Sequence, residues 1–202
     1  VTPRTRLLCL CNPHNPLGRV FVPSELEAIS QVAIAADLHI LSDEIWSDIV
    51  YSPHRHTSIA TLGDDVAMRT FTLFGFSKSH ALAGLRVGMV HTPSADLTTK
   101  LIDRSGARTT AYGVSTVSQV AATAACLHCD YWVDAFVAHL QQMRDLAIDR
   151  LNRIPGIECR VPSGTYLLFP DIRGLGATGE SLASHLLHDA KVMVAPGLPQ
   201  RT

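Results

Sequence analysis

The stretch RLLCLC at residues 6–11 is short and apolar, and it is followed by a helical pattern over residues 24–37 and a second apolar run, LHIL, at residues 38–41. Ser24, with Glu27 three residues later, is a candidate capping box that predicts where the helix begins. A strand, a helix and a strand in this order imply parallel pairing. Parallel sheets are covered by helices on both faces, and they bind ligands at the carboxyl ends of their strands.

The remaining elements are predicted from the same periodicity and turn signals. Strands are expected at residues 70–74, 86–91, 157–160, 165–169 and 192–194, and helices at residues 94–105, 114–127, 130–154 and 180–189. The order of elements changes after Pro155 and Gly156, which end the long helix. We therefore predict an α/β fold: a three-layer sandwich with a mostly parallel sheet over residues 1–130. A connecting helix and part of a smaller α+β domain are expected over residues 131–202.

The composition limits the partners of this chain. Its net charge is -1 over 202 residues and it has no basic block, which argues against nucleic acid or an anionic membrane as a partner. Every apolar stretch is interrupted well before about 18 residues, the length that a membrane-spanning helix needs. The 5 cysteines, an odd number in apolar surroundings, favour a reducing compartment, so a cytoplasmic protein is expected. The segment Cys126–Cys129 invites a metal interpretation, but without a second cysteine pair buried thiols are preferred.

Both ends of the sequence fall beside predicted strands. The first strand begins within a few residues of Val1, and its parallel pairing requires neighbours that earlier residues would supply. The sequence stops at Thr202, just after a predicted strand and a turn at Pro196 and Gly197. We expect a partial chain.

Lys78 follows the apolar run LFGFS at residues 73–77 and precedes a loop punctuated by glycine, with Arg86 further along the chain. An amine in this position can form an imine with an aldehyde cofactor and can later move a proton as the free amine. Arg86 is near enough in sequence to return to the same pocket, where its guanidinium pairs with phosphate and Ser77 adds a hydroxyl. Taken singly, either charge is more often a solvated surface group.

Two other polar residues meet the remaining needs of a cofactor with a pyridine ring. Asp43 ends the second predicted strand, and a carboxylate beside a pyridine nitrogen keeps that nitrogen protonated. Its alternative role is a helix cap for residues 44–50. Asn15 lies between Pro13 and Pro16, so its amide has a fixed direction and can donate to a phenolate oxygen. Turn chemistry alone would also explain an asparagine at this position.

Three motifs together resemble one known family. They are NPHNPLG at residues 12–18, SDEI at residues 42–45, and Ser77-Lys78 followed by LAGLR at residues 82–86. This set resembles the class I/II aminotransferases, fold type I enzymes that use pyridoxal 5'-phosphate, and the likeness runs through nearly the whole chain. The region from Ser42 to Thr70 looks closest to the branch of cystathionine β-lyase-like and cysteine-S-conjugate β-lyase enzymes.

The resemblance implies a role for each matched residue. Lys78 would be the Schiff-base lysine, Asp43 the partner of the pyridine nitrogen, and Asn15 a ligand of the phenolate oxygen. Ser77 and Arg86 would bind the phosphate. Residues 1–130 would then be the second half of the large cofactor-binding domain. By the same resemblance the complete protein is expected to be a homodimer, and the loop at residues 111–115 is expected to reach the neighbouring subunit.

The sequence also departs from the family pattern. Trp46 stands where many relatives have a tyrosine and the lyase branch often has a histidine, and an indole binds the phenolate oxygen only as an N–H donor. Gly75 stands where a further phosphate-binding serine is frequent. The family's upstream phosphate loop, its ring-stacking aromatic residue and its downstream arginine for the substrate carboxylate have no place in this sequence.

Three interpretations are open at this stage. The first is an aminotransferase that moves an amino group between an amino acid and a 2-oxo acid, which LAGLR at residues 82–86 favours as the commoner aminotransferase form. The second is a β-lyase that expels a thiolate from the β-carbon, since the matched residues serve both reactions. The third is a non-catalytic fragment of such an enzyme.

Overall fold

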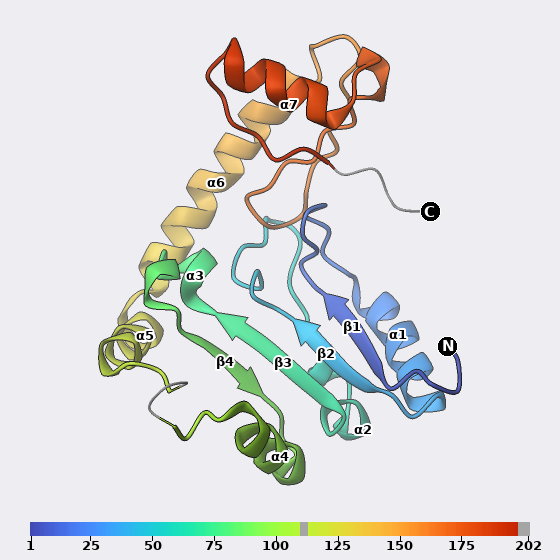
Figure 1. The fold of residues 1–202 in the computed structure, drawn as a ribbon, viewed down its shortest axis with the longest axis vertical. Helices are drawn as coiled ribbons and strands as arrows, with labels where there is room; N and C mark the ends of the chain where they lie inside the picture. Colours follow the sequence, from blue (N-terminus) through green and yellow to red (C-terminus); the bar gives the residue numbers. More distant parts are fainter. Residues whose placement is uncertain (110–112, 198–202) are drawn as a thin grey trace. The chain divides into compact units, whose positions relative to one another are not determined.

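The computed structural model describes residues 1–109 and 113–197 (Figure 1). It divides into two compact units. The first comprises Val1–Gln141 and Pro162–Leu167, and the second comprises Gln142–Val161 and Leu168–Thr202. All the predicted site residues belong to the first unit, so the two units are described separately.

A four-stranded sheet forms the centre of the first unit (Figure 1). In spatial order its strands are β1 (Leu7–Cys11), β2 (His39–Asp43), β3 (Thr70–Gly75) and β4 (Gly88–His91). The first three strands are parallel, and β4 runs antiparallel to β3. The predicted α/β fold with a mostly parallel sheet is therefore confirmed. Because β4 is reversed, its beginning lies at the same edge of the sheet as the ends of the other three strands.

Helices connect and follow these strands. They are α1 (Pro23–Ala35), α2 (Asp64–Ala67), α3 (Phe76–Ser79), α4 (Ala95–Ser105), α5 (Thr116–His128) and α6 (Asp130–Leu151), with short 3₁₀ helices η1 (Ile59–Thr61) and η2 (Ala83–Leu85). Helix α6 begins in the first unit and ends in the second.

The main core lies on one face of the sheet. Leu10 and Ile40 point from β1 and β2 to Leu26 and Ala33 of α1, and all four side chains are buried. Alternate strand residues point to opposite faces, and on the other face Leu7 of β1 is 46% exposed. Within the described residues, α1 therefore buries one face of β1, and the other face is partly exposed.

The start of α1 differs from the sequence prediction. The helix begins at Pro23 instead of after a Ser24 cap, and the carboxylate of Glu25 accepts a hydrogen bond from the Val22 amide at 3.0 Å. Proline suits the first helical position because its missing N–H has no partner inside the helix and its φ is already helical. The predicted capping box of Ser24 and Glu27 is wrong for that reason.

The second unit contains helix α7 (Gly179–His188) and the 3₁₀ helix η3 (Arg173–Leu175). The strands predicted at residues 157–160, 165–169 and 192–194 are wrong. Glu158 and Asp171 form a single isolated bridge instead. A strand requires a continuous ladder of partners, and the described residues provide none for these segments. Asn152 holds this region together, since its side chain exchanges two hydrogen bonds with the backbone of Cys159, at 2.7 and 3.1 Å.

Candidate functional site

The turn after β1 gives its two asparagines different environments. Asn12 is 1% exposed, and its amide donates to Thr57 O at 3.3 Å while its Oδ1 accepts from the Phe21 amide at 3.0 Å. Asn15 is exposed, and no described residue forms a hydrogen bond with its side chain. Asn15, the predicted ligand residue, is thus the asparagine whose amide is available to a ligand. Asn12 has a structural role.

Gly18 closes this turn in a conformation that requires glycine. Its φ is +62°, and a Cβ placed there would lie 2.3 Å from Pro162 Cβ and 2.6 Å from Gly164 O. Its carbonyl accepts from the amides of Ser163 and Gly164 at 2.8 and 2.9 Å. The turn is therefore bound to a segment that lies far away in the sequence, which local patterns did not indicate.

Asp43 lies at the end of β2, in register with Cys11 of β1 and Leu73 of β3. Its Oδ1 accepts from the Ile45 amide at 3.1 Å, and no described residue binds Oδ2. The residues that follow form turns rather than a helix, so the alternative role as a helix cap is not observed. The carboxylate is half-buried at the edge of the sheet with one oxygen available to a ligand.

Glu44 is the centre of a buried network that sequence reasoning missed. It is 5% exposed, its Oε1 accepts from the hydroxyls of Ser42 and Ser58, both at 2.8 Å, and its Oε2 lies 2.9 Å from His56 Nε2. Burial raises the pKa of Glu44, but the hydrogen bonds from His56, Ser58 and Ser42 together outweigh it and bring the pKa below its ordinary value. Glu44 therefore stays ionised and attaches the end of β2 to the loop after Tyr51. An acidic residue directly after a buried strand is the signal that could have revealed it.

Lys78 lies on α3, directly after β3. Its Nζ is 5.2 Å from the centroid of the Trp46 ring, within the range of a cation–π contact. Trp46 is 4% exposed and packs edge-to-face on Tyr166, with ring centroids 4.5 Å apart. The structure thus brings Lys78 and Trp46 together, and it presents the face of the indole to the amine.

A strained backbone residue precedes Tyr166. Thr165 has a φ of +64°, which is rare for a β-branched residue. Tyr51 Oη donates to Thr165 O at 2.5 Å, and the Thr165 amide donates to Ile49 O at 2.9 Å. These bonds stabilise the strained conformation and hold Tyr166 against Trp46, a contact that no sequence pattern predicted.

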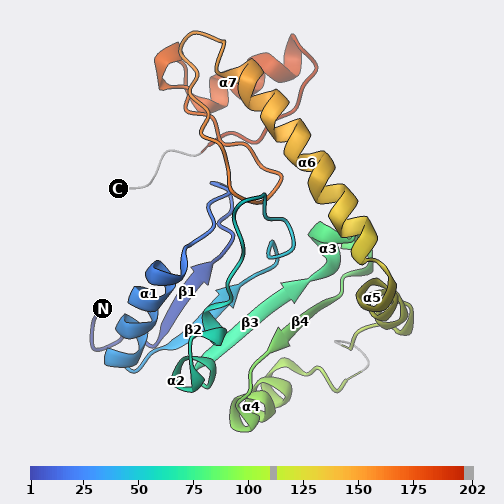
Figure 2. The ribbon, with the colours of Figure 1, turned by 180° about the vertical axis from the view of Figure 1, so that it is seen from behind.

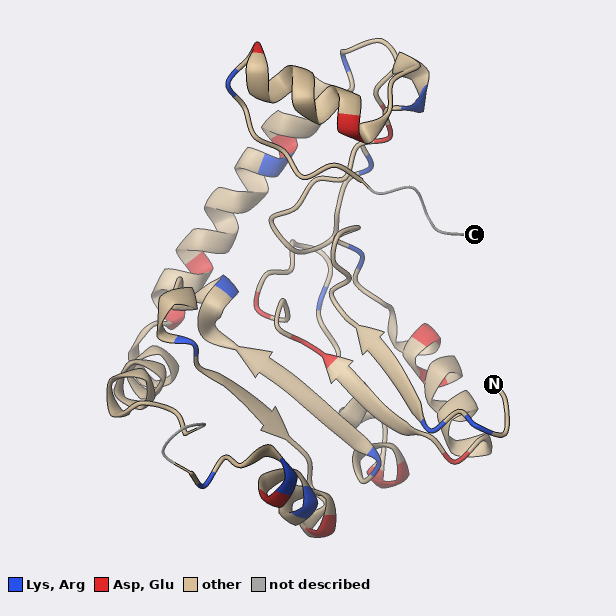
Figure 3. Cartoon of the chain, viewed as in Figure 1, with Lys and Arg blue, Asp and Glu red and all other residues tan. Residues whose placement is uncertain are grey.

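Arg86 precedes β4 and therefore lies at the sheet edge where β1, β2 and β3 end. It is exposed, and no described residue forms a hydrogen bond or an ion pair with its guanidinium. Ser77 is half-buried directly before Lys78, and its hydroxyl likewise has no bond to a described residue. Figure 3 shows acidic colour where β2 ends and basic colour on α3, so charges of both signs lie at this edge of the sheet.

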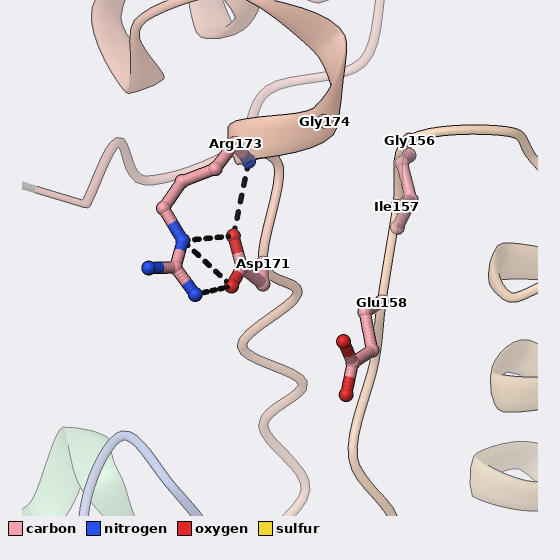
Figure 4. Close-up of a pocket in the computed structure, with 6 residues that line it drawn as sticks. All are labelled: Gly156, Ile157, Glu158, Asp171, Arg173 and Gly174. Atoms are coloured by element: carbon pink, nitrogen blue, oxygen red, sulfur yellow. Dashed lines mark hydrogen bonds and ion pairs between the residues drawn. The ribbon is translucent and has the colours of Figure 1, made fainter.

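A separate pocket of about 450 Å³ lies within the second unit (Figure 4). It is lined by Gly156, Ile157, Glu158, Asp171, Arg173 and Gly174. The Arg173 side chain is bound to Asp171, and this contact lowers the pKa of the Asp171 carboxyl to about 2. None of the predicted site residues lines the pocket.

Other sequence predictions fall on surfaces or outside the structure. Among the described residues no group of three or more histidines, cysteines and acidic residues could hold a metal. Cys126 is exposed and Cys129 is half-buried, so the preferred interpretation of this pair as buried thiols is wrong. None of the helices in residues 1–109 and 113–197 is long and apolar enough to cross a membrane. The predicted subunit-reaching loop at residues 111–115 lies partly outside the described residues, which exclude Ala111 and Tyr112.

The fold and the site together define an α/β protein with a mostly parallel sheet and a candidate site at the carboxyl ends of the parallel strands. The model of the family "Aminotransferase class I and II" matches residues 1–201. The chain belongs to the class I and II aminotransferases. The predicted membership is therefore confirmed, whereas the β-lyase branch is not.

Similar proteins support the same family. An aspartate aminotransferase of Geobacillus stearothermophilus is 32% identical over 98% of this chain and 51% of its own length. An aromatic-amino-acid aminotransferase of Thermococcus litoralis is 34% identical over 98% of this chain and 50% of its own. The crystal structure of a PLP-bound putative aminotransferase from Clostridium difficile superposes with a TM-score of 0.87 at 34% identity, over 93% of this chain and 48% of that one. The chain thus spans about half the length of these relatives.

Proposed function

We propose that the full-length protein is a pyridoxal phosphate-dependent aminotransferase that moves an amino group between an amino acid and a 2-oxo acid. The observation that carries this proposal is the position of Lys78 at the carboxyl edge of the sheet, with its Nζ 5.2 Å from the buried Trp46 ring. Family membership and the PLP-bound structure of a relative support it.

The polar groups at this edge that have no partner among the described residues match the needs of the cofactor. Lys78 offers an amine, Asp43 a carboxylate oxygen without an internal partner, and Arg86 a guanidinium without a partner among the described residues. We assign Asp43 to the pyridine nitrogen and Arg86 with Ser77 to the phosphate. Asn15 would donate to the phenolate oxygen. The Trp46 indole, with its face towards the Lys78 amine, would add apolar contact to the ring and an N–H donor.

When bound, the cofactor supplies an electron sink for the carbanion at the substrate's α-carbon. The chain's own residues do the rest. Lys78 Nζ would remove the α-proton and return it, because an amine can act in turn as general base and general acid. The Asp43 carboxylate would favour the protonated pyridine nitrogen by charge pairing.

The proposal is tested by reducing the full-length protein with sodium borohydride in the presence of pyridoxal phosphate and mapping the labelled peptide. Label on Lys78 is expected, and Lys78→Ala should lose both the label and transamination. Lys100→Ala is the matched control, because Lys100 lies on α4 in an exposed ion pair with Asp96. Label that persists in Lys78→Ala would sink the assignment.

A product assay separates the two reactions that the residues serve. Incubation with common amino acids and 2-oxoglutarate should yield a new amino acid. With cystathionine, pyruvate and a free thiol would instead indicate β-elimination, and their dominance would replace the aminotransferase assignment by that of a lyase.

A non-catalytic role of this chain by itself is the second candidate. The observation that favours it is the exposed far face of the sheet, where Leu7 is 46% exposed and Val90 of β4, which lies on the same face by the strand register, is also 46% exposed. Expression of residues 1–202 alone decides the question, since a soluble product that binds the cofactor and turns over an amino acid would exclude this candidate.

Three broader assignments complete the proposal. The full-length protein would be a cytoplasmic homodimer, and its large domain would include residues 1–130, with residues 131–202 belonging to the connecting helix and small domain. Family membership supports the homodimer and the domain boundaries, and the odd number of cysteines, 5 in all, supports the cytoplasmic location. Light scattering after gel filtration tests the dimer, and a monomeric mass would reject it.

A further inference from the structure

Arg86 has a backbone conformation that its residue type disfavours. Its φ and ψ are 53° and 38°, the left-handed region that L-residues other than glycine, asparagine and aspartate rarely enter. Such a conformation persists only where the surrounding structure holds it. Arg86 is also the guanidinium assigned to the phosphate, so the forces that hold its backbone determine where the cation points.

The peptide group before Arg86 is held at both of its polar atoms. The Arg86 amide donates to Ala83 O at 3.3 Å within η2. The carbonyl oxygen of the same peptide group, Leu85 O, accepts from the hydroxyl of Ser118 on α5 at 2.7 Å. Figure 2 shows α5 beside the segment that joins α3 to β4. The shorter of the two bonds therefore comes from a residue that is 32 positions away in the sequence from Arg86.

The hydrogen-bond directions leave Ser118 no freedom. Leu85 O can only accept, so the single hydroxyl hydrogen of Ser118 points to it. The Ser115 hydroxyl, 2.8 Å away, must then donate to Ser118 Oγ, while its oxygen accepts from the Ser118 amide at 3.2 Å. Ser118 is only 4% exposed, so little water reaches it to replace the bond to Leu85. Ser115 caps α5, and Ser118 connects that cap to the peptide group of Arg86.

We propose that Ser118 is a positioning residue for Arg86 and thereby for recognition of the cofactor's phosphate. The inference rests on the proposed function. Ser118 acts through the backbone, since its side-chain hydrogen bonds within the described residues go to Ser115 and to Leu85 O. Loss of its hydroxyl releases the Leu85 carbonyl, so Arg86 relaxes towards ordinary backbone conformations and its guanidinium leaves the position that suits the phosphate.

The test compares two ligands that differ only in the phosphate. Dissociation constants of pyridoxal phosphate and of pyridoxal are measured by spectroscopic titration of the full-length apoprotein. Ser118→Ala should weaken binding of pyridoxal phosphate about tenfold, because the energetic cost of the left-handed Arg86 backbone is no longer offset by the Ser118 bond. The dissociation constant of pyridoxal should stay within about twofold. Ser118→Thr, which keeps the hydroxyl, should restore the ratio.

Two further variants separate positioning from general stability. Ser115→Ala weakens the cap of α5 but leaves the Ser118–Leu85 bond, so its ratio of the two constants should match that of the wild type. Arg86→Ala and Arg86→Ala/Ser118→Ala should bind pyridoxal phosphate equally, because Ser118 has nothing left to position.

Equal weakening of both ligands by Ser118→Ala, or no weakening of either, would overturn the inference while Lys78 labelling still supports the function. Failure of the wild-type protein to bind pyridoxal phosphate at all would overturn both.

Discussion

Replacement of Glu44 tests whether the buried carboxylate stabilises the end of β2. Glu44→Ala removes the acceptor of three donors at once, those of Ser42, Ser58 and His56. Glu44→Gln removes only the charge and one acceptor. Its remaining oxygen can still accept from both serines. Its amide can donate to His56 Nε2 if that ring shifts its proton to Nδ1, a buried nitrogen without a partner among the described residues.

The two variants should therefore differ clearly in cost. Breaking a buried pair by removing one partner costs about 3–5 kcal/mol, which we expect for Glu44→Ala. Glu44→Gln exchanges a charge-assisted bond for a neutral one and should cost about 1–2 kcal/mol at pH 7. The exposed Glu27 of α1 is the matched control, and Glu27→Gln should leave the free energy of unfolding within about 0.5 kcal/mol.

The cost of Glu44→Gln should also depend on pH. The pKa of Glu44 is lowered in the folded protein, so its stabilisation is fully present above the pKa of the unfolded chain, about 4.3. It is lost as pH falls through the lower pKa of the folded state. The difference in unfolding free energy between wild type and Glu44→Gln should thus be constant from about pH 7 to 5 and shrink below about pH 4.

Urea denaturation of the full-length protein, followed by circular dichroism at several pH values, measures these differences. A stabilising role of the Glu44 charge is refuted if Glu44→Gln costs as much as Glu44→Ala at pH 7, or if its cost is the same at pH 3.5 as at pH 7.

Three further substitutions test the packing around the site. Gly18→Ala should lower the free energy of unfolding, measured by urea denaturation, by about 2–4 kcal/mol, because the new Cβ would lie 2.3 Å from Pro162 Cβ at a φ of +62°. An unchanged free energy of unfolding would contradict the close approach. Gly75→Ser should tighten pyridoxal phosphate binding about fivefold in the same titration, since the nearest atom to its Cβ is 3.8 Å away and the added hydroxyl would stand at the N-cap of α3, near the Ser77 hydroxyl that we assign to the phosphate. An equal gain for pyridoxal would contradict a role in phosphate binding. Trp132→Phe loses the indole bond to Ser79 O, 3.2 Å long, and should cost about 1 kcal/mol of unfolding free energy, and a larger loss would show that the ring's packing dominates.

Local signals predicted the sheet well and its surroundings less well. The apolar runs before Asp43 and Lys78 were correctly predicted as strands, because the signals for a strand lie within a few neighbouring residues. The cap of α1 was misplaced by two residues, because the N-cap is Val22 instead of Ser24 and Pro23 takes the first helical position. Segments with strand-like composition in the second unit lack ladder partners, and composition does not reveal a missing partner.

Residues of the candidate site were also predictable only where the signal is local. Sequence reasoning selected Asn15 and Asp43, and the structure leaves donor or acceptor atoms of both available at the ends of β1 and β2. It missed Glu44 and Ser118, because the partners that explain them lie 12 or more residues away.

The sequence by itself determined the family, the four strands of the sheet, and the chemical types of the residues at the strand ends, since all of these follow from short motifs and local periodicity. Only the tertiary structure decided how those residues are held. The reversal of β4 brings Arg86 to the edge where Lys78 lies, Trp46 turns its face to the amine, and Ser118 holds the peptide group before Arg86. Each of these depends on a contact between segments distant in the chain, and such contacts form only when the sheet and its helices pack together.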